Sequence, residues 1–174
     1  VRIAYNNDAL YVAIRCFDSQ PETIFATTMA KDVQIFSEDF VVLVLDTYHD
    51  HKNAYVYATN AFGAINDARA ADGRTPDTSW DGIYSVKTNI DDQGWTVEYE
   101  FPFKTLSFDP HNTTWGFNIQ RRLARLNEED RWASPRRDAS GLTPQWAGEL
   151  EGLEGLSQGV GLDIKPYGLL GVNR

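Results

Sequence analysis

Residues 94–101 read Gly94-Trp95-Thr96-Val97-Glu98-Tyr99-Glu100-Phe101, and large apolar side chains alternate with polar ones along them. A repeat of two places each set on its own face of a β-strand, so one face enters a core and the other meets solvent. The same alternation runs through Leu10-Tyr11-Val12-Ala13-Ile14-Arg15-Cys16-Phe17. The two stretches therefore predict strands with one buried face, and they place Trp95 in the core.

A third stretch, Phe40-Val41-Val42-Leu43-Val44-Leu45, is apolar throughout, which favours a central strand covered on both sides. Turn residues such as Asn6-Asn7-Asp8 and Asp91-Asp92-Gln93-Gly94 separate the runs. Strands are expected at residues 1–5, 10–17, 40–45, 54–59, 83–88, 95–101, 115–122, 146–150 and 162–169. Short helical pieces are expected at 21–29 and 101–106, and long polar loops at 68–79 and 125–145. The pattern predicts an all-β chain, a single jelly-roll-like antiparallel β-sandwich domain over residues 1–174.

The charge of the chain narrows its partners. Asp and Glu number 25 against 16 Lys and Arg, so the net charge is −9. Such a chain repels nucleic acid and anionic lipid, whereas neutral glycans and metal cations remain compatible with it. No window reaches the ~20 apolar residues that a membrane helix requires, so direct membrane insertion is not expected. The one cysteine, Cys16, is predicted to be a buried apolar side chain.

Five segments together resemble a known family. They are Val1-Arg2-Ile3-Ala4-Tyr5-Asn6-Asn7-Asp8-Ala9-Leu10-Tyr11-Val12-Ala13-Ile14-Arg15, Val44-Leu45-Asp46-Thr47-Tyr48-His49-Asp50, Ser79-Trp80-Asp81-Gly82-Ile83-Tyr84, Gly94-Trp95-Thr96-Val97-Glu98-Tyr99-Glu100-Phe101-Pro102-Phe103 and Gly148-Glu149-Leu150-Glu151-Gly152-Leu153. The chain resembles the family 9-like carbohydrate-binding domain found at the N-terminus of bacterial outer-membrane β-barrel proteins. The resemblance implies a β-sandwich that binds a polysaccharide or oligosaccharide without cutting it. It also implies a periplasmic, outer-membrane-associated or secreted location in a Gram-negative bacterium.

The two ends of the chain depart from that family. Its members begin with an Asp-Gly…Trp segment that forms an early strand, and nothing like it precedes Val1. The run Leu162-Asp163-Ile164-Lys165-Pro166-Tyr167 resembles the point where the family passes into its barrel. We therefore expect a fragment of a longer protein with a C-terminal outer-membrane barrel. A missing first strand supplied by a second chain would make the protein a homodimer.

Aromatic side chains outside the predicted core are the first candidates for sugar binding, because sugars stack their C–H faces on rings. Trp80, Trp132 and Trp146 lie in or beside the long loops, and Tyr48 and Tyr84 are weaker candidates of the same kind. Trp115, like Trp95, is predicted to be core. Polar neighbours that could bond sugar hydroxyls are Asp81, Arg136, Arg137, Asp138 and Gln145. For any one of them, a place in a solvated, charged loop is the favoured interpretation.

The turn Asp46-Thr47-Tyr48-His49-Asp50-His51-Lys52-Asn53 concentrates oxygen and imidazole groups. Calcium takes six to eight oxygen ligands, and the resembled family often holds structural calcium. The candidate calcium ligands are Asp46, Asp50 and Asn53, with Asp18 as a distant fourth. The alternatives are a polar hairpin without an ion, and a zinc or copper site at His49 and His51.

Two other functions stay open. Glu98 and Glu100 project from one strand face about 7 Å apart, inside the ~6.5–9.5 Å window of inverting glycoside hydrolases. The same carboxylates could instead pair with Arg121 or Arg122 on a neighbouring strand. Sandwich domains related to the resembled family hold b-type haem through Met and His or Lys, and Met29 is the single methionine here.

Overall fold

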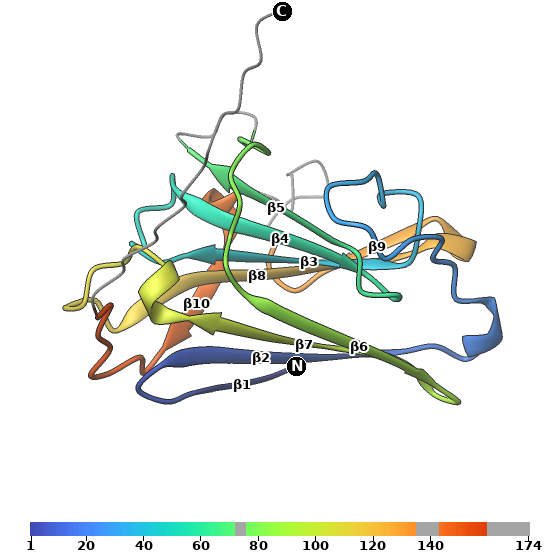
Figure 1. Cartoon of the computed structure of the whole chain (residues 1–174), viewed down its shortest axis with the longest axis horizontal. Coiled ribbons are helices and arrows are strands. Elements are labelled where there is room, and N and C mark those ends of the chain that lie inside the picture. Colours follow the sequence, from blue (N-terminus) through green and yellow to red (C-terminus); the bar gives the residue numbers. More distant parts are fainter. Residues whose placement is uncertain (72–75, 135–142, 160–174) are drawn as a thin grey trace, which may run out of the picture.

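The structure is a computed structural model, and it describes residues 1–71, 76–134 and 143–159. In these residues ten strands form two antiparallel sheets that pack face to face (Figure 1). The first sheet has the order β1 (Arg2–Tyr5), β2 (Ala9–Phe17), β7 (Gly94–Pro102), β6 (Ser85–Asp91). The second has the order β10 (Gly148–Glu151), β8 (Thr114–Leu123), β3 (Phe40–Asp46), β4 (Ala54–Asn60), β5 (Ile65–Ala70), and β9 (Glu128–Arg131) also pairs with β8. The predicted all-β sandwich is confirmed.

The helical pieces within the described part of the chain are single 3-10 turns. They are η1 (Pro21–Thr23), η2 (Phe103–Thr105), η3 (Ala124–Leu126) and η4 (Pro144–Trp146). None of these described helices has the length and apolar character needed to span a membrane.

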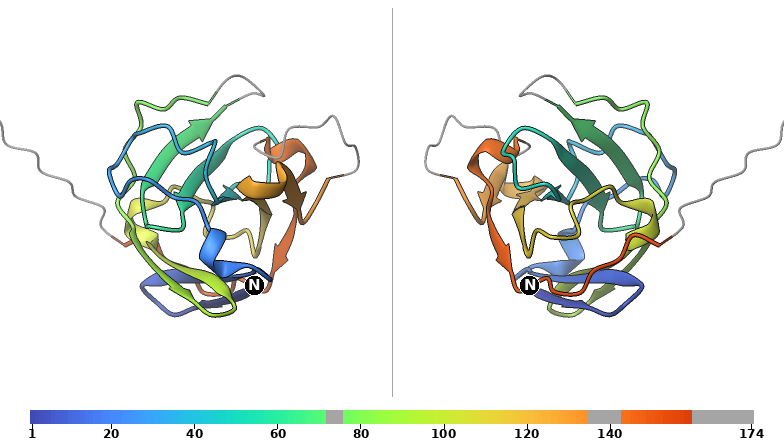
Figure 2. Two further views of the ribbon diagram at one scale, coloured as in Figure 1. Left: turned by 90° about the vertical axis from the view of Figure 1, so that its right-hand side faces the viewer. Right: turned by 90° about the vertical axis from the view of Figure 1, so that its left-hand side faces the viewer.

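The core lies between the two sheets, and the alternating stretches supply it. In the register of β2 and β7, Cys16 lies opposite Trp95 and Ile14 lies opposite Val97, and all four side chains are buried. Trp115 of β8 belongs to the same cluster from the second sheet, is also fully buried, and packs against Phe103 and Phe108. The end-on views show the sheets curving towards each other around this layer (Figure 2). The core positions of Trp95, Trp115 and Cys16 are therefore confirmed.

Strand β3 is buried along all seven residues, as its apolar sequence predicts. One side faces the first sheet, and the other belongs to a separate apolar cluster on the outer face of the second sheet. Residues 24–39 pass over part of that outer face, where Ile35 is fully buried. Elsewhere the outer face carries small side chains, among them Val42, Val56 and Ala68. This combination leaves space above the second sheet.

Several predicted boundaries were wrong. Only Pro21–Thr23 is helical within 21–29, and β5 extends into the predicted loop 68–79. Strand β9 lies inside the predicted loop 125–145 because its charged residues pair by backbone hydrogen bonds with the free edge of β8, which needs no apolar pattern. The expected strand at 162–169 lies outside the described residues.

The thiol of Cys16 is expected to resist chemical modification in the native protein. The side chain is buried, and burial raises the pKa of Cys16 to about 11, so little thiolate forms near neutral pH. A colorimetric thiol reagent at about pH 8 should react within seconds in denaturant but only over hours without it. Rapid reaction of the folded chain would contradict this burial.

Candidate functional site

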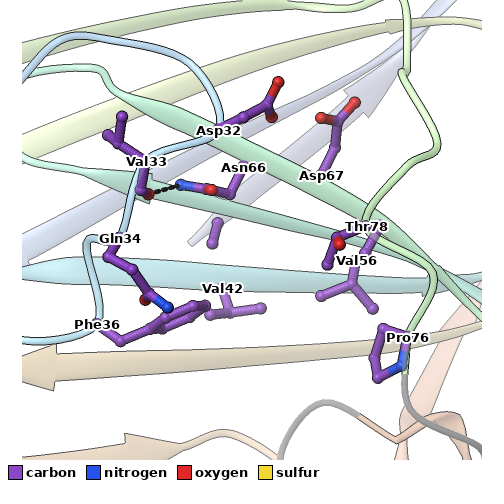
Figure 3. A pocket seen from close by; sticks show the side chains of 12 residues that line it. Asp32, Val33, Gln34, Phe36, Val42, Val56, Asn66, Asp67, Pro76 and Thr78 are labelled. Carbon is purple, nitrogen blue, oxygen red and sulfur yellow. Dashed lines mark hydrogen bonds between the residues drawn. The ribbon is translucent and has the colours of Figure 1, made fainter.

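A groove with a volume of about 360 Å³ lies on the outer face of the second sheet (Figure 3). This size falls within the range of small-molecule sites in proteins. Among the described residues, twelve side chains from three strands and two loops line it. They are Asp32, Val33, Gln34, Phe36, Val42, Val56, Ala58, Asn66, Asp67, Ala68, Pro76 and Thr78.

The floor of the groove is apolar because the outward positions of three neighbouring strands carry small aliphatic residues. Val42 comes from β3, Val56 and Ala58 from β4, and Ala68 from β5. Each of these side chains is short, and the loops that carry Gln34 and Pro76 lie on either side of the floor (Figure 3).

The walls of the groove are tied to β5 by hydrogen bonds. The Asn66 amide donates to the carbonyl of Val33 at 2.9 Å, and the backbone N–H of Asp32 donates to the carbonyl of Ile65 at 3.0 Å. On the other side, Asp77 and Arg69 exchange two backbone hydrogen bonds. These bonds hold both loops in place beside the floor.

One aromatic ring of the groove is open to solvent. Phe36 is 48% exposed, and its ring forms a T-shaped pair with the buried Phe40 at a centroid distance of 5.4 Å. Contact with Phe40 therefore supports the Phe36 ring on one side. The amides of Gln34 and Asn66 and the hydroxyl of Thr78 line the same groove. The groove thus combines an apolar floor, one supported ring and neutral polar groups.

The structure does not bring the three candidate tryptophans together. Trp80 is half-buried against Tyr55 of β4, with ring centroids 5.0 Å apart, and so closes the sandwich beside β5. Trp132 is 59% exposed and packs against Phe117 of β8 at 5.8 Å, near the opposite edge of the second sheet. Trp146 is half-buried in η4, close to β3 and β8. Trp80 and Trp132 therefore cannot stack on the same sugar.

The other predicted binding residues are also dispersed. Tyr84 is half-buried and packs against the core, where its ring lies 4.7 Å from that of Tyr57, and burial raises the pKa of its hydroxyl. Tyr48 is exposed at the β3–β4 turn, and Gln145 is exposed in η4. Asp81 lies next to the groove, where it bonds Lys31. Arg136, Arg137 and Asp138 lie outside the described residues.

The β3–β4 turn does not fit the calcium site expected there. Asp46 is fully buried, and its two carboxylate oxygens accept the backbone N–H groups of Asp50 and His51. The oxygens of Asp50 accept the backbone N–H groups of Lys52 and Asn53 and the Asn53 amide. The carboxylates therefore hold the turn itself.

The pKa shifts of the two aspartates follow from these contacts. Burial raises the pKa of Asp46, and its two hydrogen bonds offset that only in part. For Asp50 burial also acts upward, but the bonds from Asn53 and Lys52 outweigh it and lower its pKa. Asp18 is bonded to Arg125, which follows the last residue of β8. Asp46 lies opposite Gly116, near the first residue of β8. Asp18 therefore lies near the other end of β8 from this turn and does not join Asp46 and Asp50 there.

The two glutamates named for hydrolysis do not share one cleft in the described part of the chain, since Glu100 borders one surface hollow and Glu98 borders another. Glu98 and Glu100 share one face of β7, as predicted, but that face is the exposed side of the first sheet. Their cross-strand neighbours include Lys87 and Tyr11, so the expected pairing with Arg121 or Arg122 was wrong because β8 lies in the other sheet. Met29 is 76% exposed and does not offer the enclosed axial ligand that a haem would need.

Sequence reasoning missed the groove. Its floor residues are aliphatic and read as core, and the exposed ring, Phe36, lies in a segment without a strand pattern. The one available signal was the fully apolar β3, which predicts a covered outer face and hence a space between that face and its cover.

Comparisons with known proteins place this fold. The family model described as "Carbohydrate family 9 binding domain-like" matches residues 1–134. No curated protein sequence gives a significant match. A family 9 carbohydrate-binding module from Caldicellulosiruptor kristjanssonii, solved with cellotriose, is similar at 21% identity and a TM-score of 0.62, covering 94% of this chain and 78% of that one. The module from the same organism solved with glucose gives 20% identity and a TM-score of 0.55, with coverages of 86% and 73%.

A further solved structure is a candidate carbohydrate-binding protein from Bacteroides uniformis ATCC 8492. It is 13% identical with a TM-score of 0.70, and the match covers 86% of this chain and 76% of that one. At these identities the likeness shows a shared fold. The family model, in contrast, covers more than half of the sequence. The chain therefore belongs to the carbohydrate family 9 binding domain-like family.

Proposed function

We propose that this chain binds carbohydrate without cleaving it, and that the sugar lies in the groove on the outer face of the second sheet. The groove itself carries the proposal, since an apolar floor and a supported Phe36 ring suit the C–H face of a pyranose. The amides of Gln34 and Asn66 can exchange hydrogen bonds with its hydroxyls. Family membership and the solved modules with cellotriose and glucose support the same ligand class.

The carboxylates of the groove support binding rather than hydrolysis. Glycoside hydrolysis needs two carboxyl groups on opposite sides of the scissile bond. Asp32 and Asp67 line the groove, but both contact the same ammonium group of Lys31. We infer that both carboxylates serve as ion-pair partners of Lys31 rather than as an acid and a nucleophile. We therefore expect no release of reducing sugar from any glycan that binds.

Phe36→Ala is expected to weaken sugar binding about tenfold, because it removes the exposed ring from the groove. The experiment is calorimetric titration with cellotriose, together with a screen of soluble glycans by affinity electrophoresis. Trp132→Ala is the matched comparison, since it removes another exposed aromatic ring from the far edge of the same sheet. Loss of binding in Trp132→Ala with full binding in Phe36→Ala would move the site away from the groove.

The setting of the domain is a second part of the proposal. We infer from the family resemblance a periplasmic or outer-membrane location in a Gram-negative bacterium, beside a C-terminal barrel of the same chain. Strand β1 lies at the edge of the first sheet, so a homodimer would form by adding a strand there.

A further inference from the structure

Two side-chain amides line the groove on the same side. Gln34 lies in the segment that passes over the second sheet, and Asn66 lies in β5. Figure 3 shows both on one side of the groove, with the Asn66 amide nitrogen turned to Val33. A ligand that enters the groove therefore meets two neutral groups, each able to form hydrogen bonds.

The Asn66 amide is held in one orientation. Its Nδ2 donates to the carbonyl of Val33 at 2.9 Å, so the nitrogen is already used. Its Oδ1 makes no hydrogen bond with any described residue. An amide oxygen accepts hydrogen bonds and cannot donate them. Asn66 therefore offers a ligand one fixed acceptor, which suits an N–H or O–H group.

Gln34 supplies the complementary donor. Its side chain is exposed, and its amide makes no hydrogen bond with any described residue. The backbone on both sides is anchored, because the Val33 carbonyl accepts from Asn66 and the Ile35 side chain is fully buried. The Gln34 amide N–H groups are thus free to donate to a carbonyl oxygen of a ligand in the groove.

The floor beside these amides is made of aliphatic side chains. Val42, Val56, Ala58 and Ala68 are all buried, and none of them has a polar side-chain atom. A hydroxyl group that rests on such a surface loses its water without gaining a partner. A methyl group there is instead removed from water at no such cost. The floor therefore favours a ligand that carries a methyl group close to its own polar atoms.

We propose that the groove prefers N-acetylated sugars, such as N-acetylglucosamine units, over sugars with a hydroxyl on the same carbon. The inference rests on the proposed sugar binding in this groove. An acetamide group has an N–H for Asn66 Oδ1, a carbonyl for the Gln34 amide and a methyl group for the aliphatic floor. A hydroxyl can bond only one of the two amides at a time as a donor, and it leaves the floor unused.

The test compares two trisaccharides that differ at one position of each ring. Cellotriose and the β-1,4-linked N-acetylglucosamine trisaccharide share their linkage, and an acetamide replaces the hydroxyl on carbon 2. Both are uncharged, so the net charge of the protein cannot separate them. In calorimetric titrations at about pH 7 we expect the acetylated trisaccharide to bind about tenfold tighter.

Gln34→Glu tests the donor. A glutamate has nearly the same shape, but its ionised carboxylate only accepts hydrogen bonds, so the preference should fall to about threefold or less. Gln93→Glu is the matched control, because it adds the same charge at an exposed position between β6 and β7 of the first sheet and should keep the tenfold preference. An unchanged preference in Gln34→Glu, or an equal loss in both variants, would overturn the inference.

The position of the methyl group has its own readout. Saturation-transfer NMR, with the protein methyl protons irradiated, should give the acetyl methyl signal the strongest saturation of the bound trisaccharide. This result is expected because the floor residues Val42, Val56, Ala58 and Ala68 carry methyl groups. Stronger saturation of the sugar ring protons would mean that the acetyl group points to solvent, which contradicts the inference.

The remaining outcomes separate the inference from the proposed function. If cellotriose binds and the acetylated trisaccharide binds no tighter, the acetamide preference is wrong and carbohydrate binding stands. If neither trisaccharide nor any glycan of the screen binds, the proposed function is wrong and the inference falls with it.

Discussion

Ala68→Phe is expected to abolish carbohydrate binding, by at least about a hundredfold, while the protein stays folded. Ala68 lies on the groove floor in β5, between loops that are hydrogen-bonded to that strand. A phenyl ring at this position occupies the volume that a sugar ring would need. Aromatic residues are well accommodated in strands, so the fold should tolerate the change. Calorimetric titration with the tightest-binding glycan of the screen measures the loss.

Ala13→Phe is the control for that substitution. Ala13 lies opposite Glu98 in the first sheet, on the face that points away from the groove. The two variants add the same ring to neighbouring sheets, and both should keep the native circular dichroism spectrum. Binding that survives in Ala68→Phe, with its native spectrum intact, would show that the sugar lies elsewhere on the molecule.

Gly94→Ala is expected to lower the free energy of unfolding by about 3 kcal/mol or more. Gly94 begins β7 with φ +129°, a conformation that residues with a Cβ rarely adopt. A Cβ there would lie 2.1 Å from the carbonyl oxygen of Cys16 and 2.8 Å from the backbone nitrogen of Asp18. Both are backbone atoms of the paired strand or its end, so they cannot rotate away. The β2–β7 pairing would have to open.

Thermal unfolding followed by tryptophan fluorescence measures this loss, which corresponds to a fall in melting temperature of about 6–12 °C. Gly152→Ala is the matched control. Gly152 also has a positive φ, +82°, but a Cβ there would meet nothing within 4 Å. It should cost only about 1 kcal/mol of backbone strain. Equal destabilisation by the two variants would mean that the contact with Cys16 is unimportant.

Patterns within one strand predicted much of the fold. Alternation in β2 and β7 identified the buried face that carries Trp95 and Cys16, because the side-chain period of a strand depends only on local geometry. The unbroken apolar run of β3 predicted burial on both sides for the same reason. In contrast, β9 could not be found in this way, because its pairing with β8 depends on the strand edge that the fold leaves open.

The site could not be predicted from the same patterns. Trp80 and Trp132 were reasonable candidates, yet one closes the sandwich beside β5 and the other covers Phe117 at the far edge. Residue type cannot reveal whether a tryptophan in a loop faces solvent or fills a gap between sheets. Asp46 was chosen for its oxygen atoms, and the backbone N–H groups of the turn occupy them.

The sequence by itself determined the all-β class, the core tryptophans and the family, because these follow from strand periodicity and from motifs in a fixed order. Only the tertiary structure decided where a ligand could lie. The groove combines Phe36 with Val42, Val56 and Ala68, residues from one loop and three strands. Lys31, Asp67 and Asp81 likewise meet only because the chain folds around β5. Such contacts depend on how strands are ordered in the sheet, and that order arises from packing over the whole chain rather than from any local pattern.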